Sequence, residues 1–235
     1  MPDSCTEREP IAGSRSAASN VGKAAIFDLD GTLLDSMRVW TDVDNEFLHS
    51  RGFDVPPDYA ESIEHLSFDD CARYTIRRFH LPDSPQELMD EWNRMAFDAY
   101  ATTVPLKPHA GQYLRYLKAS GARLAVATSL PPNFREPVLR RLGVFDLFDA
   151  LCSVDDVGHV SKDRPDVYLH AAECVGIPAH DCTVFEDILV GIQAVKSVGM
   201  TAWAMYDASS RDHWPRIREI ADGTLHDFSD APRTL

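Results

Sequence analysis

The stretch Ile26-Phe27-Asp28-Leu29-Asp30-Gly31-Thr32-Leu33-Leu34-Asp35-Ser36 decides the fold of this chain. The apolar run that leads into it, residues 23–27, predicts a buried strand, and Gly31 predicts the turn that ends the strand. Asp28 and Asp30 stand at the mouth of that strand, where two buried acids are costly unless positive charge lies between them. A hard divalent cation with oxygen ligands is the obvious candidate.

The two aspartates suit different chemical roles. The Asp28 carboxylate could attack phosphorus and form an aspartyl phosphate, a known kind of covalent catalysis. Asp30 could protonate the leaving oxygen and then take a proton from the attacking water. The alternative is a strand that ends in solvated acids, and for an isolated Asp-x-Asp triplet that alternative is the better interpretation.

The longer string Asp-Leu-Asp-Gly-Thr-Leu-Leu-Asp-Ser resembles the first motif of the haloacid dehalogenase (HAD) superfamily. Most members of that family are magnesium-dependent phosphotransferases. The resemblance implies Mg2+ as the cofactor and a small-molecule phosphate ester as the substrate, with Asp28 as nucleophile and Asp30 as general acid and base. It also predicts three further motifs in a fixed order.

The second family motif is a Thr or Ser that ends a later apolar strand. Residues 123–129, Arg-Leu-Ala-Val-Ala-Thr-Ser, fit it. The resemblance assigns Thr128 and Ser129 to hydrogen bonds with phosphate oxygens.

The third motif is a lysine, and Lys162 fits it. Its ammonium would neutralise Asp28 and the incoming phosphate. The family more often has proline directly after the lysine, whereas this chain has Asp163 there and keeps Pro165-Asp166 in its usual place.

The fourth motif is an acidic pair that ends another apolar strand, and Glu186-Asp187 fits it. The resemblance makes Asp187 a direct metal ligand and Glu186 a ligand directly or through water, beside Asp28 and the backbone carbonyl of Asp30. Ile188 replaces the serine that the family commonly has next, which removes a hydroxyl but no carboxylate. Together the four motifs give a resemblance over about residues 23–230.

Length and charge limit the other possibilities. The 235 residues can hold a full core and a second, smaller domain. The net charge of −14 disfavours nucleic acid and anionic membrane as partners, and no apolar run is long enough to span a membrane. The five cysteines are odd in number and lack paired metal spacing, which indicates reduced thiols in a cytoplasmic protein. We expect a monomer or a weak dimer.

The order of elements predicts an α/β fold, a doubly wound parallel sheet with helices on both faces. Ligands in such folds bind at the carboxyl ends of the strands, where all four motifs lie. The expected helices and strands are helices 110–119, 134–142, 166–175 and 189–198 and strands 122–128, 150–154, 182–186 and 201–205.

Residues 36–105 are helical in pattern and resemble the cap of the beta-phosphoglucomutase-like group. We predict a small helical cap domain at 36–105, inserted into a HAD-like core of residues 23–35 and 106–235, after a mobile tail at 1–22. A cap that closes over the site would exclude water and select the substrate. The first cap helix is expected to bury one stripe of residues: Met37, Trp40, Val43, Phe47 and Leu48.

The cap separates a phosphatase from a mutase. Mutases of the beta-phosphoglucomutase type have a histidine on the first cap helix and an arginine on a cap loop that holds a second phosphate. This chain has Trp40 near the first place and Phe68 at the second, so we favour hydrolysis of a sugar phosphate and keep the mutase as the alternative. A catalytically silent relative that binds a phosphometabolite or a protein is a second alternative, disfavoured because all the motif residues are present.

Four cap residues are nominated for substrate contact, namely Arg38, Trp40, His65 and Phe68. Arg38 could supply a distal positive charge. For Trp40 the alternative is packing within the cap, and for His65 it is a hydrogen bond to a helix end.

Overall fold

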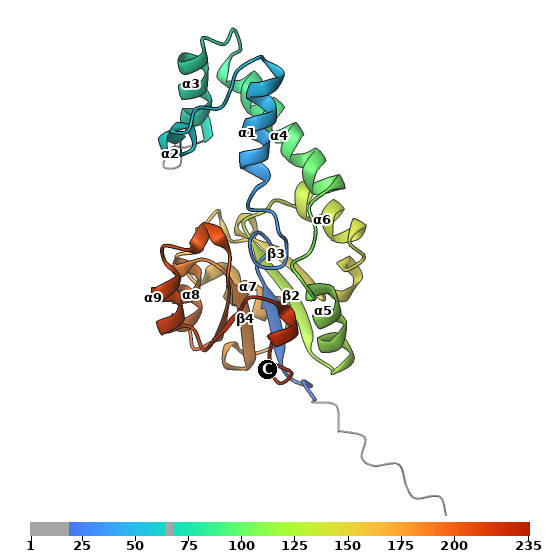
Figure 1. The fold of residues 1–235 in the computed structure, drawn as a ribbon. Helices are drawn as coiled ribbons and strands as arrows, with labels where there is room; N and C mark the ends of the chain where they lie inside the picture. Colours follow the sequence, from blue (N-terminus) through green and yellow to red (C-terminus); the bar gives the residue numbers. More distant parts are fainter. Residues whose placement is uncertain (1–18, 64–67) are drawn as a thin grey trace, which may run out of the picture.

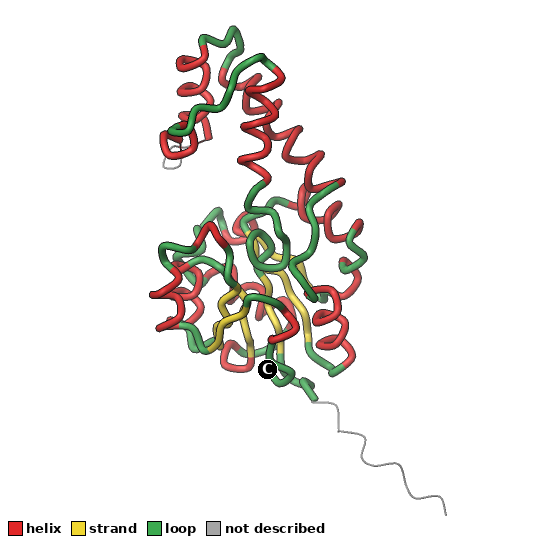
Figure 2. Tube along the Cα trace, in the orientation of Figure 1, coloured by secondary structure: helices red, strands yellow, loops and turns green. Residues whose placement is uncertain are grey.

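A computed structural model describes residues 19–63 and 68–235. Figure 1 shows a compact part built around a sheet and, at one end of it, a group of helices that stands off the sheet. In Figure 2 the strands all lie in the first part, and the described residues of the second part are helices and loops.

The sheet has six parallel strands in the order β3-β2-β1-β4-β5-β6. β1 lies at its centre between β2 and β4, and all four of its residues are fully buried, as an apolar run in a doubly covered sheet must be. The strands span β1 Ala24–Phe27, β2 Arg123–Thr128, β3 Ala150–Ser153, β4 Cys182–Glu186, β5 Thr201–Met205 and β6 Gly223–Leu225.

Helices cover both faces of the sheet. Side chains of α5 and α6 pack in one apolar cluster, and those of α7, α8 and α9 pack in a second cluster across the sheet. This arrangement confirms the doubly wound α/β fold. The helices span α5 Ala110–Ala119, α6 Pro132–Arg141, α7 Asp166–Val175, α8 Leu189–Ser197 and α9 Trp214–Ile220. Sequence analysis did not identify α9 or β6. A strand of three residues, such as β6, has too short a pattern to be recognised.

The helices that stand off the sheet are α1 Val39–Ser50, α2 Tyr59–Ile63, α3 Phe68–Phe79 and α4 Pro85–Thr102. α4 begins with a reciprocal capping box, which Ser84 and Glu87 form. Rings of Phe47 on α1 and Trp92 on α4 pack edge to face at 5.6 Å, in the core of this group.

The predicted buried stripe of α1 was wrong at its first turn. Met37 and Trp40 are 37% and 43% exposed, and Val39 is buried instead. The helix begins only at Val39, and Val39, Val43 and Phe47 follow one another at four-residue spacing along its buried face. Trp40 lies one residue past that row and so faces solvent.

Two chain segments join the helices to the sheet, and they run side by side. Leu34 and Leu106 form an antiparallel bridge, and the amide of Asp35 donates to the Pro105 carbonyl over 3.0 Å. Lys107 adds ion pairs of 3.1 Å to Asp35 and 2.6 Å to Asp207. In the described residues no helix is both long and apolar enough to cross a membrane.

Candidate active site

The carboxyl ends of three neighbouring strands bring the sequence-predicted residues to one edge of the sheet. Asp28 directly follows β1, Thr128 ends β2, and Glu186 ends β4 with Asp187 after it. The Asp28 amide donates to the Phe185 carbonyl over 3.0 Å, which continues the β1–β4 pairing to this point. Lys162 reaches the same place from the segment between β3 and α7.

Lys162 links two of the carboxylates. Its ammonium donates to Oδ1 of Asp28 and, over 2.9 Å, to Oε2 of Glu186. All three side chains are almost fully buried. Burial opposes a charged ammonium, but Asp28 and Glu186 outweigh burial and raise the pKa of Lys162 well above its usual value. The lysine is therefore held as a cation beside Asp28.

Three carboxylates lie too close together for one lysine to neutralise. Each of Asp28, Glu186 and Asp187 offers an oxygen, and these oxygens lie within 4.8 Å of one another. Burial is the main reason that the pKa of Glu186 is raised to about 7, with Asp28 adding to it. Burial and the charge of Glu186 likewise raise the pKa of Asp187 well above its usual value.

Two oxygens of this cluster are buried and accept no hydrogen bond in the described part of the chain, Oε1 of Glu186 and Oδ2 of Asp187. Buried polar atoms without partners are rare in folded proteins. Carboxylate oxygens that converge in this way suit a hard divalent cation, so these residues fit Mg2+. The hydroxyl of Tyr168, a residue that sequence analysis did not nominate, donates to the other Glu186 oxygen over 3.2 Å.

Asp30 has hydrogen-bond partners of its own. Its Oδ1 accepts hydrogen bonds of 2.6 Å from Ser36 Oγ and from the Tyr100 hydroxyl. Burial and the nearby charge of Asp28 raise its pKa. A carboxyl group with a raised pKa can carry the proton that a general acid must donate. Sequence analysis did not nominate Tyr100, because it is the last residue of an apolar stripe on α4 and its ring was expected to pack in the core.

Two glycines allow the acidic cluster to form. Gly31 has φ +80°, and a Cβ there would collide with Oδ2 of Asp187 and come within 2.8 Å of its Cγ. On α8, a Cβ at Gly191 would lie 2.7 Å from both Glu186 Cγ and the Tyr168 hydroxyl. Both positions therefore need a residue without a side chain.

The two residues nominated for phosphate binding differ in their surroundings. Thr128 is fully buried, and its Oγ1 accepts a hydrogen bond of 3.0 Å from the Leu130 amide. Its hydroxyl proton remains available to a phosphate oxygen. Ser129 is exposed at the same strand end.

The structure brings together two of the four nominated cap residues. The rings of Trp40 and Phe68 pack edge to face at 5.6 Å, and both are more than a third exposed. Arg38 is exposed at the start of α1, and His65 lies outside the described residues.

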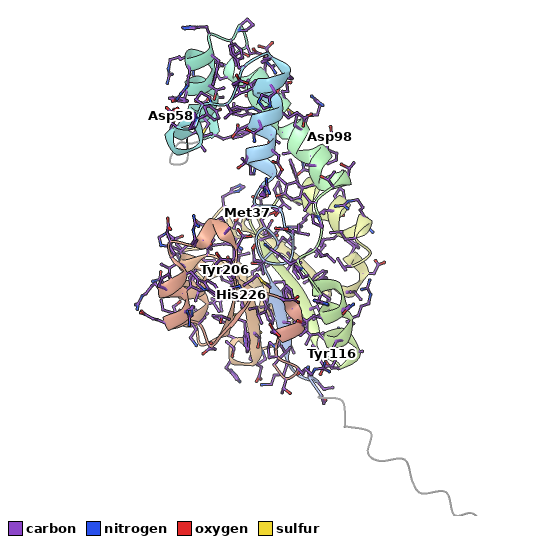
Figure 3. The ribbon with its side chains drawn as sticks, in the orientation of Figure 1. Met37, Asp58, Asp98, Tyr116, Tyr206 and His226 are labelled. Carbon is purple, nitrogen blue, oxygen red and sulfur yellow. The ribbon has the colours of Figure 1, made fainter. Side chains whose placement is uncertain are left out.

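Met37 lies beside the acidic cluster. It lies where α1 meets the sheet, as Figure 3 shows, and its Cγ is 3.2 Å from the position of a Cβ at Gly31. Sequence analysis placed Met37 in the cap core, so its position beside the site is found only in the structure.

Comparison with known proteins gives matches over most of the chain. The family model for haloacid dehalogenase-like hydrolases matches residues 23–199. A protein of Drosophila melanogaster described as a probable pseudouridine-5'-phosphatase is 32% identical over 180 residues, which cover 74% of this chain and 78% of that protein. The beta-phosphoglucomutase of Bacillus subtilis is 28% identical over 193 residues, 77% of this chain and 81% of its own.

The fold also matches solved structures. The crystal structure of CbbY from Rhodobacter sphaeroides in complex with phosphate superposes with a TM-score of 0.70 and 23% identity. The superposition covers 91% of this chain and 97% of that one.

Proposed function

This chain belongs to the haloacid dehalogenase-like hydrolase family, and on that basis we propose that it is a Mg2+-dependent phosphatase. Its substrate is a small phosphorylated metabolite, a sugar phosphate in the first instance, and its reaction passes through an aspartyl phosphate on Asp28. The observation that carries the proposal is the pairing of Asp28 with a buried Lys162, next to carboxylate oxygens that accept no hydrogen bond from the described residues.

In the first half of the reaction, an oxygen of Asp28 forms a bond to phosphorus as the bond between phosphorus and the leaving alkoxide breaks. Asp30 gives its proton to that leaving oxygen, which its raised pKa makes possible. Lys162 and the Thr128 hydroxyl bind the phosphoryl oxygens, with Ser129 as a further donor. These groups are positioned before the substrate arrives, so little reorganisation is needed.

In the second half, water attacks the phosphorus of the aspartyl phosphate. Asp30, now a carboxylate, accepts a proton from that water, and the bond between phosphorus and Asp28 breaks to release inorganic phosphate. The same residue thus serves as acid and then as base.

The metal would be held by Asp28, Asp187 and the backbone carbonyl of Asp30, with Glu186 as a ligand directly or through water. When bound, Mg2+ supplies positive charge that offsets the crowded carboxylates and the phosphoryl group. Oδ2 of Asp187, which accepts no hydrogen bond within residues 19–63 and 68–235, supports its part in this set. The Glu186 oxygen that faces Lys162 and Tyr168 is already used, which leaves Oε1 for the metal or its water.

Hydrolysis is favoured over mutase activity because Trp40 and Phe68 stand at the cap positions where the mutases have a histidine and an arginine. A mutase must hold a second phosphate, and arginine suits that task through its two-pronged hydrogen bonding. Met37, Trp40 and Phe68 present apolar surface instead, which we propose contacts the leaving group. Arg38 keeps the mutase as a second candidate, and one relative of this chain is a beta-phosphoglucomutase.

The first experiment measures hydrolysis of para-nitrophenyl phosphate with Mg2+, with EDTA, and with the Asp28→Asn variant as the inactive control. Mg2+-dependent release of phosphate supports the proposal, and a rate equal to that of the variant would favour a catalytically silent binding protein. A screen of phosphorylated sugars and nucleotides then identifies the substrate.

The second experiment separates the two activities. The enzyme is incubated with beta-glucose 1-phosphate, a trace of the 1,6-bisphosphate and Mg2+. Rapid formation of glucose 6-phosphate with little inorganic phosphate would overturn the phosphatase in favour of the mutase.

We keep a cytoplasmic location, a monomer or weak dimer, and the absence of nucleic acid and membrane partners as predictions.

A further inference from the structure

A second group of metal-binding side chains lies away from the acidic cluster. Cys152 comes from β3, and His170 and Cys174 come from α7. Each offers one ligand atom, and the three atoms lie within 4.8 Å of one another. Strand β2 lies between β3, which carries Cys152, and β1, which Asp28 directly follows.

Secondary structure and packing together create this group. His170 and Cys174 are four residues apart on one helix, so their side chains share a face. That face meets β3, and Cys152 packs in the same apolar cluster as Val167 and Ala171 of α7. Cys152 is buried, whereas His170 is half-buried and Cys174 is exposed, so an ion can reach the group from solvent.

The chemistry of the three ligands selects the metal. Two thiolates and an imidazole prefer zinc, whereas Mg2+ requires oxygen ligands. Bond lengths in tetrahedral zinc sites place a sulfur and a nitrogen ligand about 3.5 Å apart. Cys174 Sγ and His170 Nε2 are 3.6 Å apart, so this pair needs almost no rearrangement to bind zinc. The Asp156 carboxylate, which acts electrostatically on both Cys152 and His170, favours a cation here, whereas the buried Arg135 guanidinium, which also acts on Cys152, opposes one.

We propose that Cys152, His170 and Cys174 form a zinc site, with a water molecule as the fourth ligand. The bound ion ties β3 to α7, the two elements that flank the segment carrying Lys162. Because the ion binds the folded protein and the ligands are apart in the unfolded chain, zinc raises the free energy of unfolding by RT ln(1 + c/Kd), where c is the free Zn2+ concentration. The site lies outside the acidic cluster, and the bound ion acts by holding these two elements together.

Cobalt is the probe for this site, because thiolate ligands give Co2+ an intense charge-transfer absorption that oxygen ligands do not. The full-length protein is kept reduced, stripped of metal, and titrated with Co2+ in excess Mg2+, which occupies the acidic cluster. We expect a thiolate-to-cobalt band with one equivalent of Co2+, and its loss when Zn2+ is added.

Variants test whether the cobalt absorption band depends on the proposed ligands. Cys174→Ser and His170→Ala should each weaken Co2+ binding by at least about tenfold, since even residues that only support a metal ligand have effects of this size. Cys71→Ser and His180→Ala replace a cysteine and a histidine outside the group and should leave the titration unchanged. Circular dichroism of each metal-free variant checks that it is folded.

Thermal unfolding gives a second readout. Zn2+ in excess Mg2+ should raise the Tm of the wild-type protein and of the Cys71→Ser control, and should not raise that of Cys174→Ser. No thiolate band in the wild-type protein, or an undiminished band in Cys174→Ser, would overturn the proposal. So would a Cys152–Cys174 disulfide that mass spectrometry still detects in the reduced protein, since its sulfurs cannot act as thiolates.

Discussion

The Tyr100 hydroxyl donates a hydrogen bond of 2.6 Å to Oδ1 of Asp30, although the two residues are 70 positions apart in the chain. Tyr100 lies near the end of α4, and Arg141 of α6 donates to its carbonyl over 3.1 Å. The ring of Tyr100 also packs on Phe134 of α6 at 5.6 Å. The helical region thus supplies a residue that positions the proposed general acid.

Removing this hydroxyl should slow the reaction and shift its pH dependence. Tyr100→Phe should lower kcat/KM by about tenfold, the effect expected for one hydrogen bond to a charged group. The bond also lowers the pKa of Asp30, so its loss should move the alkaline limb of the pH–rate profile to higher pH. Tyr116→Phe, which removes a hydroxyl bonded to the Arg233 carbonyl, is the matched control. An unchanged profile for Tyr100→Phe would show that Tyr100 only supports the fold.

Two substitutions separate the nucleophile from the acid. Asp28→Asn should abolish turnover, because an amide cannot form the phosphoenzyme. Asp30→Asn should reduce kcat by about 10²–10⁴-fold, the usual contribution of general acid–base catalysis, while Mg2+ binding persists through its backbone carbonyl. Steady-state kinetics and calorimetric Mg2+ titration check both results. Near wild-type activity in Asp28→Asn would rule out the covalent mechanism.

Without its metal, the protein should lose stability as the pH rises from about 4.3 to about 7. The pKa of Glu186 is raised to about 7 by burial, against about 4.3 in an unfolded chain. Between these values the folded state holds more protons than the unfolded state, so the free energy of unfolding falls as pH rises. Asp187 and Asp30 change in the same direction.

Thermal unfolding across this pH range, in EDTA and in Mg2+, measures the effect. The stabilisation by Mg2+ should be larger at pH 8 than at pH 5, since the cation binds the ionised carboxylates. Asp187→Asn should reduce this difference. An Mg2+ effect that is the same at both pH values would contradict the assignment of the metal to this cluster.

Gly31 and Gly52 offer a matched pair for testing the approach of Gly31 to Asp187. Both have a positive φ, +80° and +82°, but a Cβ at Gly52 would meet nothing within 4 Å. Each alanine variant should lose about 1–2 kcal/mol of stability from backbone strain. Only Gly31→Ala should also weaken Mg2+ binding, because its Cβ displaces the Asp187 carboxylate. Urea unfolding and Mg2+ titration measure the two effects separately.

The amino-acid sequence alone predicted the fold and the residues that lie at the strand ends of the candidate site. Asp28, Thr128 and Glu186 each lie at the end of an apolar run, and the alternation of helix and strand indicates a parallel sheet. In such a sheet the strand ends meet at one edge, so local pattern is enough to predict that these residues come together. Their roles in binding and catalysis remain predictions.

The partners of those residues were decided only by tertiary structure. Tyr100, Tyr168 and Met37 are ring or apolar side chains whose sequence pattern marks a packed face and does not say which polar group lies across it. The wrong assignment of Met37 and Trp40 has the same origin, because the sequence pattern did not show that α1 begins at Val39 and buries Val39, so that Met37 precedes the helix and Trp40 points to a neighbouring face. Cys152 meets His170 only because α7 packs on β3. Periodicity along a chain reports which side of an element is buried, and the contacts across that side depend on how whole elements pack.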